Sequence, residues 1–334
     1  VNIIQNQYFK KPDKIRTIGI TKTNIDFFNS KILNIDKIKW EINKIEIFSE
    51  NFEKKKLIDF KKKNSEPLFS IVKNSDLVDS LKKSLIKNKY FELINLKKNS
   101  NFTNDFNLII NTDYYEKISK KFFNKKIVKK YNSIAYITII EHEKLKNNIA
   151  TQIFTKNGPL AFLPVSNNVT SVVFSDDSLN IRNNDSIRNL IDRYNFKYKI
   201  RKINEVKFFE LESLNLRSYY NKNILAFGDL IHRIHPLAGQ GFNMTIRDIK
   251  ELTNIIKSKI KLGLDLDVSV NKEFEKNTKS KNYIFSNGID LIHEFFNLES
   301  KFNNDFLSKS VKLFGKSSFI NKSLIQFADN GRLL

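Results

Sequence analysis

Glycine and proline are scarce in this chain, and where they fall is the strongest constraint on its fold. The 334 residues include 9 Gly and 5 Pro. Three of these glycines and one proline lie within residues 228–248, GDLIHRIHPLAGQGFNMTIRD, beside two of the four histidines. Because such residues permit tight turns and close backbone approach, we expect this segment to bring main chain close to a bulky ligand.

The flanks of this segment predict a strand before it and a helix after it. Residues 223–227 are apolar and predict a buried strand that ends in a Gly228–Asp229 turn. A helical pattern opens near 241–243 and runs to about 262, and Gly263 suits its C′ position. Ligands bind at the carboxyl ends of strands in open α/β sheets, and helix N-termini favour anionic atoms. The sequence therefore predicts a binding site at this strand–loop–helix junction.

Elsewhere the chain mixes helical and alternating patterns, and several strand patterns are consecutive. Helices are predicted at 24–36, 74–88 and 186–195 and from 271 onward, and strands at 1–7, 40–50, 55–61, 106–115, 133–143 and 170–175. This order predicts an α/β nucleotide-binding sheet with a second, mainly antiparallel sheet inserted in it and helices at the C-terminal end.

The formal net charge of +22 would by itself suggest nucleic acid as a partner. However, 49 of the 58 basic residues are Lys, scattered from end to end, whereas nucleic-acid readers usually use clustered Arg forks. We therefore expect no nucleic-acid partner. Codon bias explains the Lys-rich surface better than binding does, and attraction to anionic membrane surfaces is the alternative.

Several other classes of site are excluded or disfavoured. The absence of Cys excludes disulfides, thiolate metal sites and Cys nucleophiles, and fits a cytoplasmic protein. No run of about 18 apolar residues is free of charge, so we expect no transmembrane helix. His232 and His235 lack a third metal ligand nearby, so we expect structural histidines and no metal.

Residues 228–248 resemble the FAD-binding motif of the aromatic-ring flavoprotein monooxygenases, which share the para-hydroxybenzoate hydroxylase fold. They match every fixed position of the ubiquinone-biosynthesis hydroxylase branch: Gly-Asp-x-x-His-x-x-His-Pro-Leu-Ala-Gly-Gln-Gly-x-Asn, then Arg-Asp. Three other segments are similar to segments of that branch in the same order: KIRTIGIT (14–21), SIVKNSDLVDSL (70–81) and NGPLAFLPVSNNVTSVVFS (157–175).

The resemblance implies a domain division and a set of cofactor contacts. It implies a glutathione-reductase-type FAD domain from 1–38, 62–130 and 213–270, a substrate-binding sheet domain from 39–61 and 131–212, and a C-terminal helical region, 271–334. It places Asp229 on the ribitol chain, Pro236 against the isoalloxazine ring and Arg16 at the diphosphate or the flavin edge. The implied FAD-binding residues are Arg16, Asp113, Gly228, Asp229, Pro236, Gly239, Gln240, Gly241, Phe242 and Asn243.

The implied reaction is hydroxylation of a phenol ring, with a polyprenyl phenol as the substrate that fits the branch. NAD(P)H reduces FAD, and a flavin C4a-hydroperoxide transfers oxygen to the ring. Such a substrate would lie between the flavin and the inserted sheet, and it would suit a protein held peripherally on the inner face of the membrane or in a biosynthetic complex. The sequence identifies no catalytic base.

Four departures from the family pattern keep alternatives open. The Gly-x-Gly-x-x-Gly turn that opens the family is absent with its β-α unit, and Gln5 stands where an acidic residue normally holds the ribose. The family's Asp-Gly motif is Asp113-Tyr114, and its downstream Arg is Lys120. A relative that has lost catalysis and serves as a binding or scaffold subunit is one alternative, and another flavoenzyme of this fold, such as a prenyl reductase, is the other.

Overall fold

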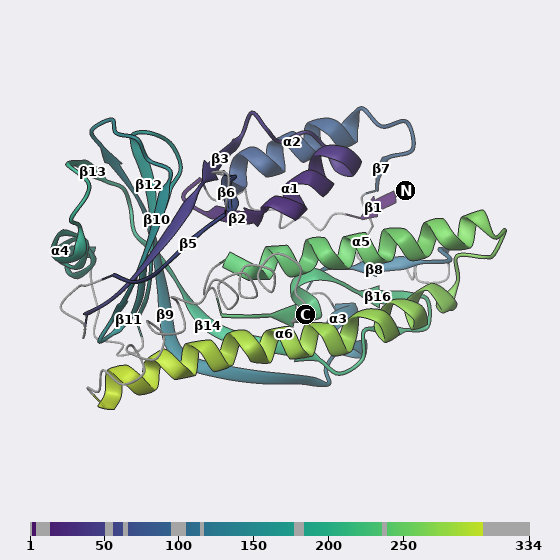
Figure 1. Cartoon of the computed structure of the whole chain (residues 1–334). Coiled ribbons are helices and arrows are strands. Elements are labelled where there is room, and N and C mark those ends of the chain that lie inside the picture. Colours follow the sequence, from purple (N-terminus) through teal and green to yellow (C-terminus); the bar gives the residue numbers. More distant parts are fainter. Residues whose placement is uncertain are drawn as a thin grey trace.

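The computed structural model describes residues 2–4, 14–50, 56–62, 66–94, 105–113, 117–176, 184–235 and 239–302. The expectations for Gln5, Tyr114, Pro236 and residues 303–334 lie outside these ranges. Within them, a large sheet stands at one end of the molecule, and smaller sheets with long helices occupy the other (Figure 1).

The large sheet is nine-stranded and almost entirely antiparallel. Its strands are β4 (Lys44–Ser49), β5 (Lys56–Lys61), β9 (Lys126–His142), β10 (Ile149–Thr155), β11 (Gly158–Pro164), β12 (Val169–Asp176), β13 (Ile200–Ile203), β14 (Lys207–Leu216) and β17 (His232–Arg233). They are ordered β17-β14-β9-β12-β11-β10-β4-β5, with β13 also paired to β9. Only the β4–β10 pair is parallel. The predicted antiparallel sheet is confirmed.

Helix α4 (Asn184–Tyr194) covers the outer face of this sheet (Figure 1). Alternate residues of the strands point to this face, so Ile140 and Phe174 are buried against Ile187 and Ile191 of the helix. Burial of such side chains stabilises the sheet by roughly 1.5–3 kcal/mol each.

Three smaller sheets lie away from α4. One contains β2 (Thr17–Thr21), β3 (Lys39–Ile42) and β6 (Phe69–Lys73); another contains β8 (Ile109–Asn111), β15 (Tyr220–Asn221) and β16 (Ile224–Ala226); the third pairs β1 (Asn2–Ile4) with β7 (Glu92–Ile94). The accompanying helices are α1 (Lys22–Phe27), which continues as the π-helix η1 (Phe28–Ile32), α2 (Asn74–Ile86) and α3 (Lys117–Phe122). The β8–β16 and β1–β7 pairs are parallel, as nucleotide-binding sheets require.

Two long helices, α5 (Gln240–Lys261) and α6 (Val268–Phe302), pack side by side and antiparallel (Figure 1). Gly263 follows α5 with a φ of +68°, which confirms its predicted C′ position. No helix in the described ranges combines the length and the apolar character needed to cross a membrane. The predicted α/β fold with helices at the C-terminal end is therefore confirmed.

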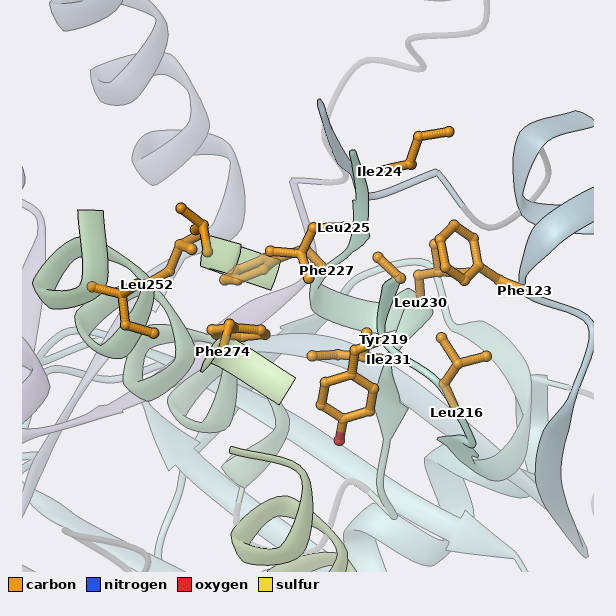
Figure 2. Close-up of a cluster of buried hydrophobic side chains, with 13 residues drawn as sticks. Phe123, Leu216, Tyr219, Ile224, Leu225, Phe227, Leu230, Ile231, Leu252 and Phe274 are labelled. Atoms are coloured by element: carbon orange, nitrogen blue, oxygen red, sulfur yellow. The ribbon is translucent and has the colours of Figure 1, made fainter. Parts of the chain in front are cut away.

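An apolar core lies under the glycine-rich segment (Figure 2). Phe227 and Leu230 come from the end of β16 and the turn that follows it, Leu252 from α5 and Phe274 from α6. The rings of Phe227 and Phe274 lie 5.5 Å apart. Because this core fixes both sides of the Gly228–Asp229 turn, the turn has a defined position relative to α5.

Candidate functional site

The predicted junction is built where two parallel strands end. Asn111 of β8 is opposite Ala226 of β16, and the Phe227 amide donates to the Asn111 carbonyl at 2.9 Å. Asp113 and Gly228 follow these residues by two positions, so they leave the sheet at the same carboxyl edge. The structure thus brings together two segments that the sequence singled out separately.

The Gly228–Asp229 turn is a 3-10 helix, η5 (Gly228–Leu230). Gly228 has a φ of +63°, a conformation that side chains with a Cβ rarely adopt. Apart from the residues next to it in the chain, no described residue has a heavy atom within 4 Å of the position that a Cβ would take there. Asp229 is exposed, and its backbone carbonyl accepts a hydrogen bond from Arg233 Nε at 3.2 Å. The exposed Asp229 is therefore accessible to a ligand at this turn.

Gly239 and Gly241 serve the start of α5 differently. Gly239 is the N-cap of α5 in the left-handed conformation, with a φ of +62°. A Cβ on Gly239 would lie 3.8 Å from the amide nitrogen of Gly19 in β2, which is an ordinary van der Waals distance. Glycine is therefore required by the left-handed backbone conformation and not by lack of room for a side chain. A Cβ on Gly241 would meet Ile234 at 3.8 Å without backbone strain.

Asn243 fastens the start of α5 to the end of β2. Its Oδ1 accepts from the Thr21 amide at 3.0 Å and from Asn24 Nδ2 at 2.9 Å. Its Nδ2 donates to the carbonyls of Gly19 at 2.9 Å and Gly239 at 3.2 Å. An amide side chain offers two donor and two acceptor positions, and all four are used within the protein.

Other predicted site residues lie in mixed surroundings. Phe242 is half-buried and packs against Phe28, with ring centroids 6.4 Å apart. Its side chain therefore faces the helix formed by α1 and η1. Asp113 is half-buried at the end of β8, and its amide donates to Asn111 Oδ1 at 3.1 Å. Arg16 is exposed just before β2, and Pro236 lies outside the described residues.

A buried acid–histidine pair, Asp248 of α5 and His232 of β17, lies between two elements of the junction. His232 Nε2 lies 2.6 Å from Asp248 Oδ2, and the two side chains are 1% and 2% exposed. The other carboxylate oxygen of Asp248 accepts from Asn282 Nδ2 of α6 at 3.0 Å. No group of three candidate metal ligands occurs within the described ranges.

A second buried acid, Asp290, comes from α6 and also lies near this segment. The hydroxyl of Tyr131 in β9 donates to Asp290, and the ring of His235 meets the Tyr131 ring edge-on with centroids 5.0 Å apart. Burial raises the pKa of the Asp290 carboxyl, while the hydrogen bond from Tyr131 opposes that rise. Burial and Asp290 both raise the pKa of Tyr131.

Comparison with known proteins assigns this junction to a cofactor domain. Residues 115–261 match the FAD binding domain family. The matched range contains β16, η5, β17 and α5, which are the elements that build the junction.

Individual relatives and a solved structure agree with this assignment. Ubiquinone biosynthesis monooxygenase COQ6 of Schizosaccharomyces pombe is 27% identical over 37% of this chain and 26% of its own length. The 3-demethoxyubiquinol 3-hydroxylase of Escherichia coli is 29% identical over 43% of this chain and 39% of its own. The chain thus matches less than half the length of these curated relatives.

The solved structure of p-nitrophenol 4-monooxygenase PnpA from Pseudomonas putida has a TM-score of 0.77 at 10% identity, and the match covers 100% of this chain and 92% of that one. At 10% identity this similarity shows a shared fold and does not by itself show a shared function. The chain therefore has the fold of FAD-dependent monooxygenases, and residues 115–261 are the part that matches the FAD binding domain.

The chemistry of the junction fits FAD. Gln240, at the first position of α5, is 6% exposed, and its Oε1 has no hydrogen-bond partner among the described residues. A buried amide oxygen without a donor is unfavourable unless a ligand supplies one. The first turn of α5 carries no acidic side chain, so its free N–H groups and positive dipole end remain available to an electron-rich ring or a phosphate.

Sequence reasoning missed several residues whose hydrogen bonds hold the junction in place. Asn24 Nδ2 donates a hydrogen bond to Asn243, and the Gly19 carbonyl accepts one from it. Asn282 Nδ2 donates a hydrogen bond to Asp248. Gly19 could have been found, because a lone glycine inside a strand pattern indicates a close backbone approach. The roles of Asn24 and Asn282 have no local signal, since their partners are distant in sequence.

Proposed function

We propose that this chain is an FAD-dependent monooxygenase that hydroxylates the ring of a polyprenyl phenol in ubiquinone biosynthesis. The observation that carries the proposal is the glycine-lined junction in which the end of β16, the left-handed Gly239 and the N-terminus of α5 meet, inside a matched FAD-binding domain. Relatives named for ubiquinone biosynthesis and ubiquinol hydroxylation support the substrate class.

Each residue of the junction has a proposed role toward the cofactor. The exposed Asp229 carboxylate accepts hydrogen bonds from ribitol hydroxyls, and Gly228 leaves the space for that chain. Main chain at Gly239 and Gly241 approaches the flavin ring. Gln240 turns its buried amide oxygen to a ring N–H. We keep Arg16 at the diphosphate or flavin edge and Asp113 beside Asp229 as further contacts.

FAD, when bound, supplies the redox chemistry that passes electrons from NAD(P)H to O₂, which side chains cannot do. The protein supplies placement and electrostatics. The N-terminus of α5 stabilises negative charge on the ring edge that faces it, because its N–H groups are already oriented. Asn243 keeps that helix end fixed against β2 through four hydrogen bonds.

The substrate is placed between two domains in this proposal. The FAD domain comprises 1–38, 62–130 and 213–270, and the sheet domain comprises 39–61 and 131–212. Strand β9 (Lys126–His142) crosses the boundary between them and pairs with β14 along its length.

We also propose that the protein docks peripherally on the cytoplasmic face of the membrane through the C-terminal end of α5. Ile260 and Leu262, at the C-terminal end of α5, are 61% and 68% exposed and are flanked by Lys257 and Lys261. Exposed apolar side chains among lysines suit an anionic bilayer surface.

Vesicle sedimentation tests this docking. The chain should sediment with phosphatidylglycerol-containing vesicles more than with phosphatidylcholine vesicles, and Ile260→Asp with Leu262→Asp should abolish the difference. Ile284→Asp is the matched control, because Ile284 of α6 is also 61% exposed. Equal losses in both variants, or no binding by the wild-type chain, would contradict membrane docking through α5.

The cofactor is tested by visible absorption of the purified chain after FAD addition and gel filtration. Retained bands near ~370 and ~450 nm are expected of a bound flavin. Asp229→Ala should weaken retention, whereas Asp265→Ala, an exposed acid after α5, should not. Phenol-stimulated, oxygen-consuming oxidation of NAD(P)H then tests the activity. A wild-type chain that retains no flavin would overturn the proposal and favour a scaffold role.

A further inference from the structure

The buried Asp248–His232 pair links the two halves of the junction. His232 lies in β17, three residues after Asp229, and Asp248 lies in α5, seven residues after Gly241. The 2.6 Å contact between His232 Nε2 and Asp248 Oδ2 therefore joins the strand side of the junction to the helix side. With Asp248 as the acceptor, Nε2 is the ring nitrogen of His232 that donates this hydrogen bond.

Helix α6 supports this link with a buried polar stripe. Asn282, Ser286 and Asp290 follow one another at intervals of four residues and share one helix face. They contact Asp248, Asn215 of β14 and Tyr131 of β9, respectively. Asn282, Ser286 and Asp290 are all less than 9% exposed. A buried polar stripe on a helix is unfavourable unless its hydrogen-bond partners are in place.

We propose that Asp248 is a positioning residue that, held by Asn282 of α6, sets the distance between the Asp229 turn and the N-terminus of α5. A carboxylate buried to this degree is stable only with its donors in place. The pair thereby selects one arrangement of β17 against α5. The inference concerns the FAD site and rests on the proposed function.

The ordinary alternative is that Asp248 only joins α5 to α6. The chain contains a matched example of that lesser role. Glu251 lies three residues further along α5, and its Oε1 accepts from Asn277 Nδ2 of α6 at 2.7 Å. Glu251→Gln thus removes a carboxylate from an α5–α6 contact that involves no histidine of β17, and it is the control for Asp248→Asn.

Hydrogen exchange of the full chain without FAD separates the two readings. Asp248→Asn should speed exchange of the hydrogen-bonded amides in 228–235 and in the first intrahelically bonded turn of α5, 244–247, by about tenfold or more, the size expected for a lost charge-assisted hydrogen bond. Glu251→Gln should leave these amides unchanged. Uniform acceleration along α5 and α6 in both variants would overturn the proposal, because it would reduce Asp248 to a helix–helix contact.

Replacement of the histidine gives a rescue test. His232→Gln keeps a donor near the Nε2 position and should restore slow exchange relative to His232→Leu. Equal exchange in both would overturn the proposal. Should Asp248→Asn fail to fold, Asn282→Ala keeps the pair and removes only its support, and it should accelerate the same amides to a smaller extent; no acceleration would overturn it.

Flavin titration supplies the functional readout. The FAD dissociation constant should rise about tenfold or more in Asp248→Asn and stay within about twofold in Glu251→Gln. Equal affinity in the two variants would overturn the positioning role. A wild-type chain that binds no FAD would sink the proposed function alone, because the exchange experiment still decides whether Asp248 positions β17 against α5.

Discussion

Asn243 was predicted from its motif as a cofactor residue, and its side chain is fully occupied inside the protein. Asn243→Asp replaces two donors with acceptors that face the carbonyls of Gly19 and Gly239. We expect the free energy of unfolding to fall by at least about 2 kcal/mol, because buried acceptors would oppose one another. Urea denaturation measures this, with the exposed turn variant Asn168→Asp as a control that changes little.

The glycines at the start of α5 make a second residue-scale pair. Gly239→Ala forces a side chain into a backbone φ of +62° and should reduce the free energy of unfolding by about 1–2 kcal/mol. Gly241→Ala meets only Ile234 at 3.8 Å and should leave stability unchanged or slightly higher, because alanine favours helix. Equal destabilisation by both substitutions would show that space, not conformation, selects glycine at 239.

At the scale of elements, strand β9 carries a buried histidine that should make stability depend on pH. Burial lowers the pKa of His142 below the ordinary 6.5, and the charge of Lys197 lowers it further, against the effect of the Glu143 carbonyl. Its Nδ1 lies 2.8 Å from that carbonyl, which only accepts, so Nε2 accepts from the Thr170 hydroxyl at 2.9 Å.

A histidine with a lowered pKa binds its proton more readily in the unfolded chain. Stability is therefore complete above pH 6.5 and is lost as the pH falls from there toward the lowered value, with a slope of at most about 1.4 kcal/mol per pH unit. His142→Asn should flatten this part of the profile. Urea unfolding between pH 8 and pH 5 checks it, and parallel profiles for variant and wild type would refute the assignment.

Elements were predictable where their signals are local. The strand, turn and helix of residues 223–263 follow from an apolar run, a Gly-Asp pair and a terminal glycine, all within one short stretch. The partners of buried polar groups were not predictable. Thr21 and Asn243 are 222 residues apart, and Asp248 meets Asn282 only because α6 folds back along α5. Such pairings depend on the assembled fold rather than on any sequence window.

At the scale of the whole molecule, separate sheets pack on common cores: Ile42 of β3 and Ile71 of β6 are buried together with Ala150 of β10. We therefore expect one cooperative unfolding transition. Trp40, the only tryptophan, reports on β3, where its Nε1 donates to the Asn147 carbonyl at 2.6 Å. Phe274→Ala, in the fully buried core of Figure 2, should lower stability by about 3–5 kcal/mol. Tryptophan fluorescence and circular dichroism should shift together.

Phe208→Ala is the control for this experiment, since Phe208 is 71% exposed and should contribute little. A Phe274→Ala variant whose circular dichroism transition moves while the Trp40 transition stays would show that the two ends of the molecule unfold independently. In that case the long β9–β14 pair would not transmit stability between them.

The hydrogen bond from Thr21 to Asn243 also has a consequence for synthesis. The donor leaves the ribosome 222 residues before its acceptor. At about 5–20 residues per second, β2 and α1 wait on the order of ten to forty seconds before the helix that completes their site is made. During that interval the buried Ile20 and Ile25 lack Ile246, their later neighbour in the core. The nascent chain therefore offers an apolar surface to chaperones, and its cofactor site can close only late in translation.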